Sequence, residues 1–240
     1  MTSLFGTSDI KRVGGVATAI SALAWLLVIA RPTEGHHVHH GSVAITNWLT
    51  MLIAMMAPVL IAPLVHVRRH SFAYRRLRAA SLFVLAYGLT WMLFLVTLEN
   101  AQGYVESTAV VVIVALLWQC SPVKQRCLNH CHALPELAAF GLAADTDVFR
   151  FGITYAVWCI GSCWALMWVS MVYASVLPMI AVSFVIVSER FERPAAPAWR
   201  WRGTRIPIRI LLARSQMLLA KTLCPVTAIP SFVDDTIPEP

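Results

Sequence analysis

Sulfur-bearing side chains recur every four residues in one apolar segment of the sequence. A spacing of four residues places side chains on one face of a helix, and thiolate and thioether groups are soft ligands that favour Cu(I) over hard cations. The stripe therefore predicts Cu(I) ligands. The alternative is a metal-free core, because free cysteine is among the most buried residue types. The stripe consists of Cys159, Cys163, Met167 and Met171.

A second set of sulfur atoms precedes this stripe in the sequence. Met51, Met55 and Met56 lie in another apolar segment, where Met51 and Met55 share one helix face. At a rise of about 1.5 Å per residue, these methionines fall at the same depth as Cys163 and Met167, about 9 to 18 Å below the outer surface of a membrane. We therefore expect the two sets to meet in one layer that binds copper as Cu(I).

Histidines crowd the segment just before these methionines. Four of five consecutive residues are imidazoles, which bind copper or zinc at neutral pH. A solvated polar loop is the alternative interpretation. The four residues are His36, His37, His39 and His40.

A further pair of thiols, Cys127 and Cys131, again has a spacing of four residues. In a helix the two side chains face the same way, and they predict a cytoplasmic two-thiol site for a soft metal. The alternative is that both thiols pack against other helices, while Lys124 and Arg126 contact lipid phosphates.

The segments that carry these residues are long and apolar. The 240-residue sequence is 58% hydrophobic and only 13% charged, which is unlike a soluble domain. A membrane core about 30 Å thick requires about 20 apolar residues per helix, so the pattern predicts an all-α, polytopic bundle of about six transmembrane helices. The predicted spans are Val13–Ala30, Ser42–Val67, Ser81–Leu98, Thr108–Ser121, Phe151–Tyr173 and Val176–Ser188.

The basic residues predict the orientation of this bundle. Of the 19 lysines and arginines, only Arg31 falls in a segment that this topology places outside. Positive charge favours the cytoplasmic side and contacts anionic headgroups, so we expect both termini in the cytoplasm and the lipid bilayer, not nucleic acid, as the partner of the net charge of +7.

The cytoplasmic segments divide the chain into two predicted parts. Residues 1–193 form the bundle, with a long inner loop at Pro122–Arg150, and residues 194–240 form a tail. Within the tail the basic, apolar run Ile206–Leu223 predicts an amphipathic helix in the membrane interface. No Asp, Glu, Lys or Arg lies in the middle of a predicted span, which argues against a proton-coupled transporter or an ion channel.

The motifs together resemble a bacterial family of unknown function described as predicted metal-binding integral membrane proteins. The resemblance covers residues 46–194 and implies a multi-pass protein of the bacterial inner membrane. Two positions depart from the family pattern, because Ser162 stands where the family often has a second Cys, and Arg190 stands where it has Lys. The matching residues are Trp48, Met51, Ala54, Met55, Met56, Pro58, Gln119, Pro122, Lys124, Cys127, Leu128, Cys131, Gly152, Tyr155, Cys159, Gly161, Cys163, Trp164, Leu166, Met167, Met171, Met179 and Glu189.

These observations favour a copper-handling membrane protein. The histidines would collect the ion outside and the sulfur layer would hold it as Cu(I), for delivery to a membrane oxidase or monooxygenase, or inward to Cys127 and Cys131. A non-catalytic accessory subunit of a larger membrane complex is the second hypothesis. A copper-dependent oxidase is the third, since we find no catalytic set of side chains, no Gly-rich phosphate loop and no cluster of histidines within a predicted span.

Overall fold

A computed structural model describes residues 7–30, 41–102, 107–138, 140–173 and 175–200 of the chain, and within these ranges the regular structure is entirely helical. The first helix, α1, is Thr7–Ala30. The second predicted span consists of three consecutive pieces, α2 (Gly41–Met56), the 3-10 turn η1 (Ala57–Leu60) and α3 (Ile61–Arg69). The prediction of an all-α chain is confirmed.

The next two helices are α4 (Arg76–Gln102) and α5 (Thr108–Cys120). After α5 the chain bends by 64° into a further helix, α6 (Pro122–Cys131). Ser121 caps α6, because its hydroxyl accepts a hydrogen bond from the amide of Val123, and proline is well suited to the first turn of a helix. The predicted loop Pro122–Arg150 was therefore wrong at its start, where a capped helix forms.

The longest helix is α7 (Gly141–Tyr173), which begins ten residues before the predicted span and rises about 50 Å over its 33 residues. That length exceeds the membrane core of about 30 Å. Near its first turn Asp145 forms ion pairs with Arg75 at 2.5 Å and Arg78 at 2.6 Å, at the beginning of α4. The start of α7 therefore forms a charged contact with the start of α4.

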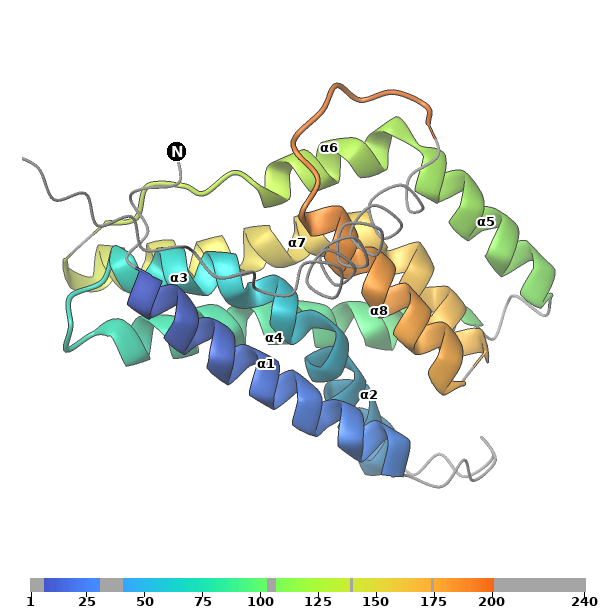
Figure 1. Ribbon diagram of the computed structural model, residues 1–240, viewed down its shortest axis with the longest axis horizontal. Helices are drawn as coiled ribbons and strands as arrows, with labels where there is room; N and C mark the ends of the chain where they lie inside the picture. Colours follow the sequence, from blue (N-terminus) through green and yellow to red (C-terminus); the bar gives the residue numbers. More distant parts are fainter. Residues whose placement is uncertain (1–6, 31–40, 103–106, 139, 174, 201–240) are drawn as a thin grey trace, which may run out of the picture. The chain divides into compact units, whose positions relative to one another are not determined.

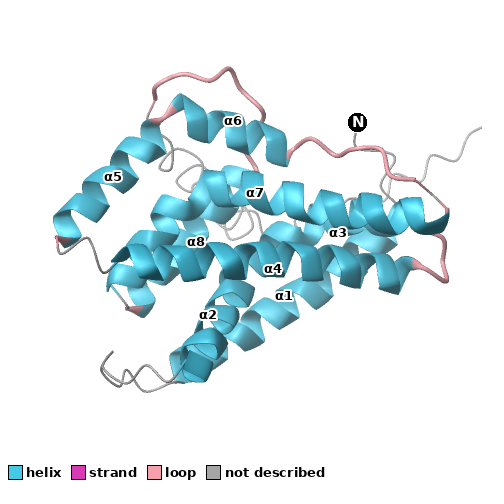
Figure 2. Cartoon of the chain, turned by 180° about the vertical axis from the view of Figure 1, so that it is seen from behind, coloured by secondary structure: helices cyan, strands magenta, loops and turns pink. Residues whose placement is uncertain are grey.

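Helix α7 is also the centre of the packing. It contacts α4, α5 and α6 as well as the last described helix, α8 (Val176–Arg190). Figures 1 and 2 show α7 lying between α4 on one side and α6 on the other, with α1 packed along α2. Gly152 allows the close approach of α7 to α4, since a Cβ atom there would lie 2.8 Å from the Cβ of Ala86 and 2.9 Å from the carbonyl oxygen of Phe83.

Four helices among the described residues are long and apolar enough to cross a membrane, and a fifth crossing results if α5 and the bent continuation α6 form one span. Helix α8, the sixth predicted span, has 15 residues and rises about 22 Å. The structure therefore supports a membrane protein with four or five candidate spans. The spans are Ile10–Ala30, Thr46–Arg69, Arg76–Leu98 and Gly141–Tyr173, with Thr108–Cys120 and Pro122–Cys131 as the bent pair.

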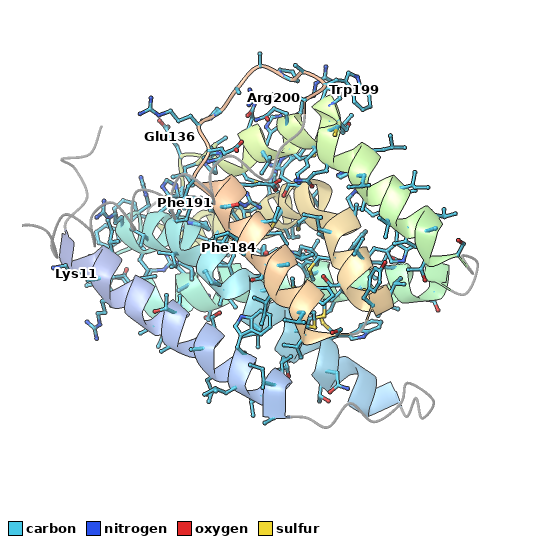
Figure 3. The ribbon with its side chains drawn as sticks, turned by 45° about the vertical axis from the view of Figure 1, so that its right-hand side comes forward. Lys11, Glu136, Phe184, Phe191, Trp199 and Arg200 are labelled. Atoms are coloured by element: carbon cyan, nitrogen blue, oxygen red, sulfur yellow. The ribbon has the colours of Figure 1, made fainter. Side chains whose placement is uncertain are left out.

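After α8 the chain runs back along α6. Asn129 donates to the carbonyl of Ala195 at 2.8 Å and accepts from its amide at 3.3 Å, and the amide of Arg200 donates to the carbonyl of Cys120 at 3.3 Å. Figure 3 shows Trp199 and Arg200 on this segment above α6. The predicted amphipathic helix Ile206–Leu223 lies outside the described residues.

Candidate metal centre

A break in the second predicted span positions two of the candidate methionines. Met55 and Met56 end α2, and both are buried. Pro58 in η1 has no N–H, so the carbonyl of Ala54 loses the hydrogen bond that a regular helix would supply. The hydroxyl of Ser21 on α1 donates to that carbonyl instead, at 2.7 Å in a buried position. Helix α1 thus stabilises the break beside the two methionines.

The α7 stripe contributes sulfur atoms to the same hydrophobic cluster as these methionines. Besides Cys159, four candidate ligands from α2 and α7 are at most 1% exposed and belong to one continuous hydrophobic cluster. Met51 and Met171 are half-buried and pack against that cluster. We call the following residues the sulfur core, and the expected contact between the two sets stays a prediction. The sulfur core is Met55, Met56, Cys163 and Met167.

Cys159, one turn from Cys163 on α7, lies where several helices meet. Its Sγ accepts a hydrogen bond from Nη2 of Arg190 on α8 at 3.0 Å and lies 3.3 Å from the hydroxyl of Tyr87 on α4. Nη2 of Arg190 also donates to the hydroxyl of Ser162 at 3.3 Å. The Cys163 thiol donates to the Cys159 carbonyl at 3.0 Å. Cys159 is thus the most highly connected thiol of the centre.

The other two candidate thiols reach this region from α6. Cys127 and Cys131 are both buried, and Gly161 of α7 makes room for Cys127, since a Cβ atom at that glycine would lie 2.7 Å from the Cys127 Sγ. The indole of Trp118 donates to the Gly161 carbonyl at 3.0 Å. Cys131 belongs to the same hydrophobic cluster as the sulfur core. The two thiols therefore face α7.

A buried polar network was missed from the sequence. Lys124 is 0% exposed and Glu189 is 2% exposed, and the Lys124 ammonium lies 2.8 Å from the Glu189 carboxylate. Lys124 also donates to the side-chain oxygen of Gln119 at 2.5 Å, and the Gln119 amide donates to Glu189. The suggestion that Lys124 contacts lipid phosphates was therefore wrong. Glu189 lies in the last turn of α8.

The signal that would have found this network was present in the motifs. All three of its residues were among the matches to the family pattern. A charged side chain buried in an apolar protein needs a partner of opposite charge. The matches at Lys124, after one span, and at Glu189, at the end of another, were therefore the signal that could have predicted this pair.

The histidines His36, His37, His39 and His40 lie outside the described residues. Within the described ranges, no group of three or more His, Cys, Asp or Glu side chains is arranged to hold a metal ion. Methionine thioethers, which lie outside that set of side chains, are soft donors that suit a monovalent ion.

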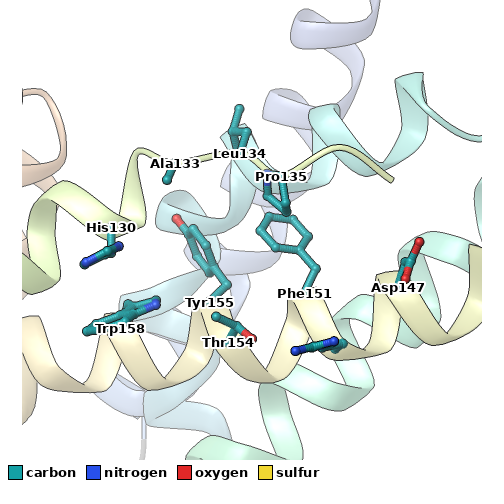
Figure 4. Close-up of a pocket in the computed structure, with 10 residues that line it drawn as sticks. His130, Ala133, Leu134, Pro135, Asp147, Phe151, Thr154, Tyr155 and Trp158 are labelled. Atoms are coloured by element: carbon teal, nitrogen blue, oxygen red, sulfur yellow. The ribbon is translucent and has the colours of Figure 1, made fainter. Parts of the chain in front are cut away.

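A cavity of about 350 Å³ opens beside this region, between α7 and the segment that follows α6. Figure 4 shows His130 stacked on Trp158, with ring centroids 4.2 Å apart, and Tyr155 at the cavity wall. The Tyr155 ring lies 5.9 Å from the Arg190 guanidinium carbon. Tyr155 thus lines the cavity and also lies near the guanidinium that contacts Cys159.

A family model described as a copper chaperone, PpoB2, matches residues 45–211. The chain belongs to the PpoB2 copper chaperone family. Neither the curated proteins nor the solved structures contain a match to the chain.

Membership of this copper chaperone family agrees with the donor atoms of the site. The matched range contains the three α2 methionines, both α6 cysteines and all of α7 and α8. Copper is therefore the cargo of the protein, and the prediction of copper from soft ligands is confirmed. The choice of individual ligands stays a prediction.

Proposed function

We propose that this PpoB2-family protein holds copper as Cu(I) in the sulfur core and passes it on within the membrane. The observation that carries the proposal is that two methionines of α2 and the Cys163 and Met167 side chains of α7 share one buried cluster. Thioethers and thiolates bind Cu(I) without the hard oxygen ligands that other cations require. Met51 and Met171 at the edge of the cluster would add donors as the ion enters.

We further propose a topology of six spans in the bacterial inner membrane, with both termini in the cytoplasm. The restriction of Lys and Arg to alternate connecting segments supports this orientation. Helix α8 would then complete the sixth crossing together with the residues at its ends. The histidines His36, His37, His39 and His40 would lie on the outer side and collect copper.

Two routes of delivery are compatible with this arrangement. The ion would leave sideways to a membrane oxidase or monooxygenase, or inward along the α7 stripe towards Cys159 and the two α6 thiols. The stripe from Met171 to Cys159 spans about 18 Å of helix. The inward route would end beside the cavity lined by His130 and Tyr155.

The test compares copper binding by the purified full chain in detergent with that of variants. In a Met55→Leu, Cys163→Ser double variant we expect the Cu(I) affinity to fall by about tenfold or more, since even residues behind metal ligands contribute about that much. The matched control is Met92→Leu with Cys120→Ser. Met92 packs on the same hydrophobic cluster from α4, and Cys120 is a half-buried thiol of α5.

Competition against a Cu(I) chelator supplies the affinity, and elemental analysis supplies the stoichiometry. The proposal requires the control to bind as the wild type does. Equal losses in both double variants would indicate a packing effect. Unchanged binding in the Met55→Leu, Cys163→Ser protein would remove the sulfur core as the site.

A further inference from the structure

Arg190 is an uncommon group to find beside cysteines in an apolar bundle. Its Nη2 contacts the Cys159 thiol at 3.0 Å and the Ser162 hydroxyl at 3.3 Å. The two remaining guanidinium nitrogens, Nε and Nη1, are buried and have no hydrogen-bond partner among the described residues. Buried donors without acceptors are costly, so this guanidinium is poised for additional negative charge.

Among the described residues, no carboxylate forms an ion pair with Arg190. Lys124 and Glu189 form an ion pair at 2.8 Å and cancel each other. The other groups near the guanidinium are Tyr155, Cys131 and Cys159. Cys131, on α6, interacts electrostatically with both Cys159 and Arg190. Two thiols from different helices therefore interact with one buried positive charge, Cys159 by direct contact and Cys131 electrostatically.

We propose that Cys131 and Cys159 form a two-thiolate site for a monovalent soft cation, and that Arg190 is the counter-ion that selects monovalent over divalent metals. The inference rests on the proposed handling of Cu(I) and adds a second binding site for the ion, one helical turn inward from Cys163. It also replaces the pair predicted from the sequence, Cys127 with Cys131, by a pair that joins α6 to α7.

The selectivity follows from the charge of the buried assembly. Two thiolates and one monovalent cation carry one net negative charge, which the guanidinium cancels. The same two thiolates with a divalent cation are neutral, so the guanidinium is left as an uncompensated charge in apolar surroundings. Burial of an unpaired charge is strongly unfavourable. A divalent ion such as zinc also requires about four ligands, whereas two cysteines are sufficient for Cu(I).

The experiment measures the affinities of the full chain in detergent for Ag(I), a redox-inert monovalent probe, and for Cd(II), a divalent one. Thiolate-to-metal absorption reports binding at cysteines alone. We compare the wild type with Arg190→Gln, which removes the charge, and Arg190→Lys, which keeps it. We expect Arg190→Gln to shift the ratio of affinities towards Cd(II) by about tenfold or more, and Arg190→Lys to keep the wild-type ratio. A Ser162→Ala variant, which removes the uncharged acceptor, should also keep it.

A second comparison leaves Arg190 in place and identifies the thiol pair. Cys131→Ser and Cys159→Ser should each lose the Ag(I) site, while Cys127→Ser should retain it. An equal loss in Cys127→Ser and Cys131→Ser would overturn the pairing. A ratio unchanged in Arg190→Gln, or changed as much in Arg190→Lys, would overturn the role of the guanidinium. A wild type that binds neither Ag(I) nor Cu(I) would instead refute the proposed function itself.

Discussion

The hydrogen bond from Ser21 to the Ala54 carbonyl supplies the sharpest test of how the methionines are positioned. Replacing Ser21 by Ala removes the hydrogen-bond donor of the buried Ala54 carbonyl. Pro58 cannot replace that donor, because proline has no N–H. A hydrogen bond contributes about 1 kcal/mol to the stability of a soluble protein. A side-chain hydrogen bond between the helices of a membrane protein contributes about 0.6 kcal/mol on average. We therefore expect Ser21→Ala to lower the free energy of unfolding by about 0.6 to 1 kcal/mol.

The second perturbation removes the reason for that hydrogen bond. In a Pro58→Ala protein the new amide can donate to the Ala54 carbonyl and continue the helix. In that background Ser21→Ala should leave the free energy of unfolding almost unchanged. The coupling energy between Ser21→Ala and Pro58→Ala should therefore be close to the full effect of Ser21→Ala in the wild type. Because Met55 and Met56 lie between Ala54 and Pro58, Ser21→Ala should also weaken Cu(I) binding by a few fold, about fivefold for 1 kcal/mol.

The assay is unfolding in mixed detergent micelles, followed by helical circular dichroism, together with Cu(I) competition on the same samples. Ser21→Thr keeps the hydroxyl and should rescue both properties. Thr18→Ala is the control on the same helix, since the Thr18 hydroxyl bonds only the α1 carbonyls of Gly14 and Gly15 in the described structure. Equal costs of Ser21→Ala with and without Pro58 would refute the reasoning.

Three further predictions concern the packing, the polar network and the topology. Gly152→Ala should destabilise the protein by about 1 to 3 kcal/mol, because its Cβ would meet α4 at 2.8 Å, whereas Gly88→Ala, with no atom within 4 Å, should leave the stability unchanged or slightly raised in the same unfolding assay. Lys124→Met alone should cost about 3 to 5 kcal/mol by leaving the Glu189 charge buried, and adding Glu189→Gln should recover most of that loss; additive losses would contradict the ion-pair interpretation. A reporter fused after Pro240 should be active only in the cytoplasm, and activity on the opposite side of the membrane would mean an odd number of crossings.

Local chemistry made much of the architecture predictable. The predicted span Thr108–Ser121 agrees within one residue with α5, and the predicted end of the fifth span at Tyr173 is the end of α7. An apolar helix in a membrane needs no partner to define its limits, since its length and polar flanks do so. The predicted boundaries were wrong where helix-capping residues start a helix in a polar segment. Ser121 and Pro122 do so at the start of α6, within a predicted loop.

The sequence alone also predicted a soft ion as the cargo, because the softness of sulfur belongs to each cysteine and methionine wherever the chain places it. Which thiols meet, and beside which charge, was decided only by the tertiary structure. The bend after α5 turns Lys124 inward to Glu189, and the end of α8 carries Arg190 to Cys159 on α7. Helical periodicity fixes the face on which a side chain lies but not the helix that this face meets, so contacts among α6, α7 and α8 could not be predicted from spacing.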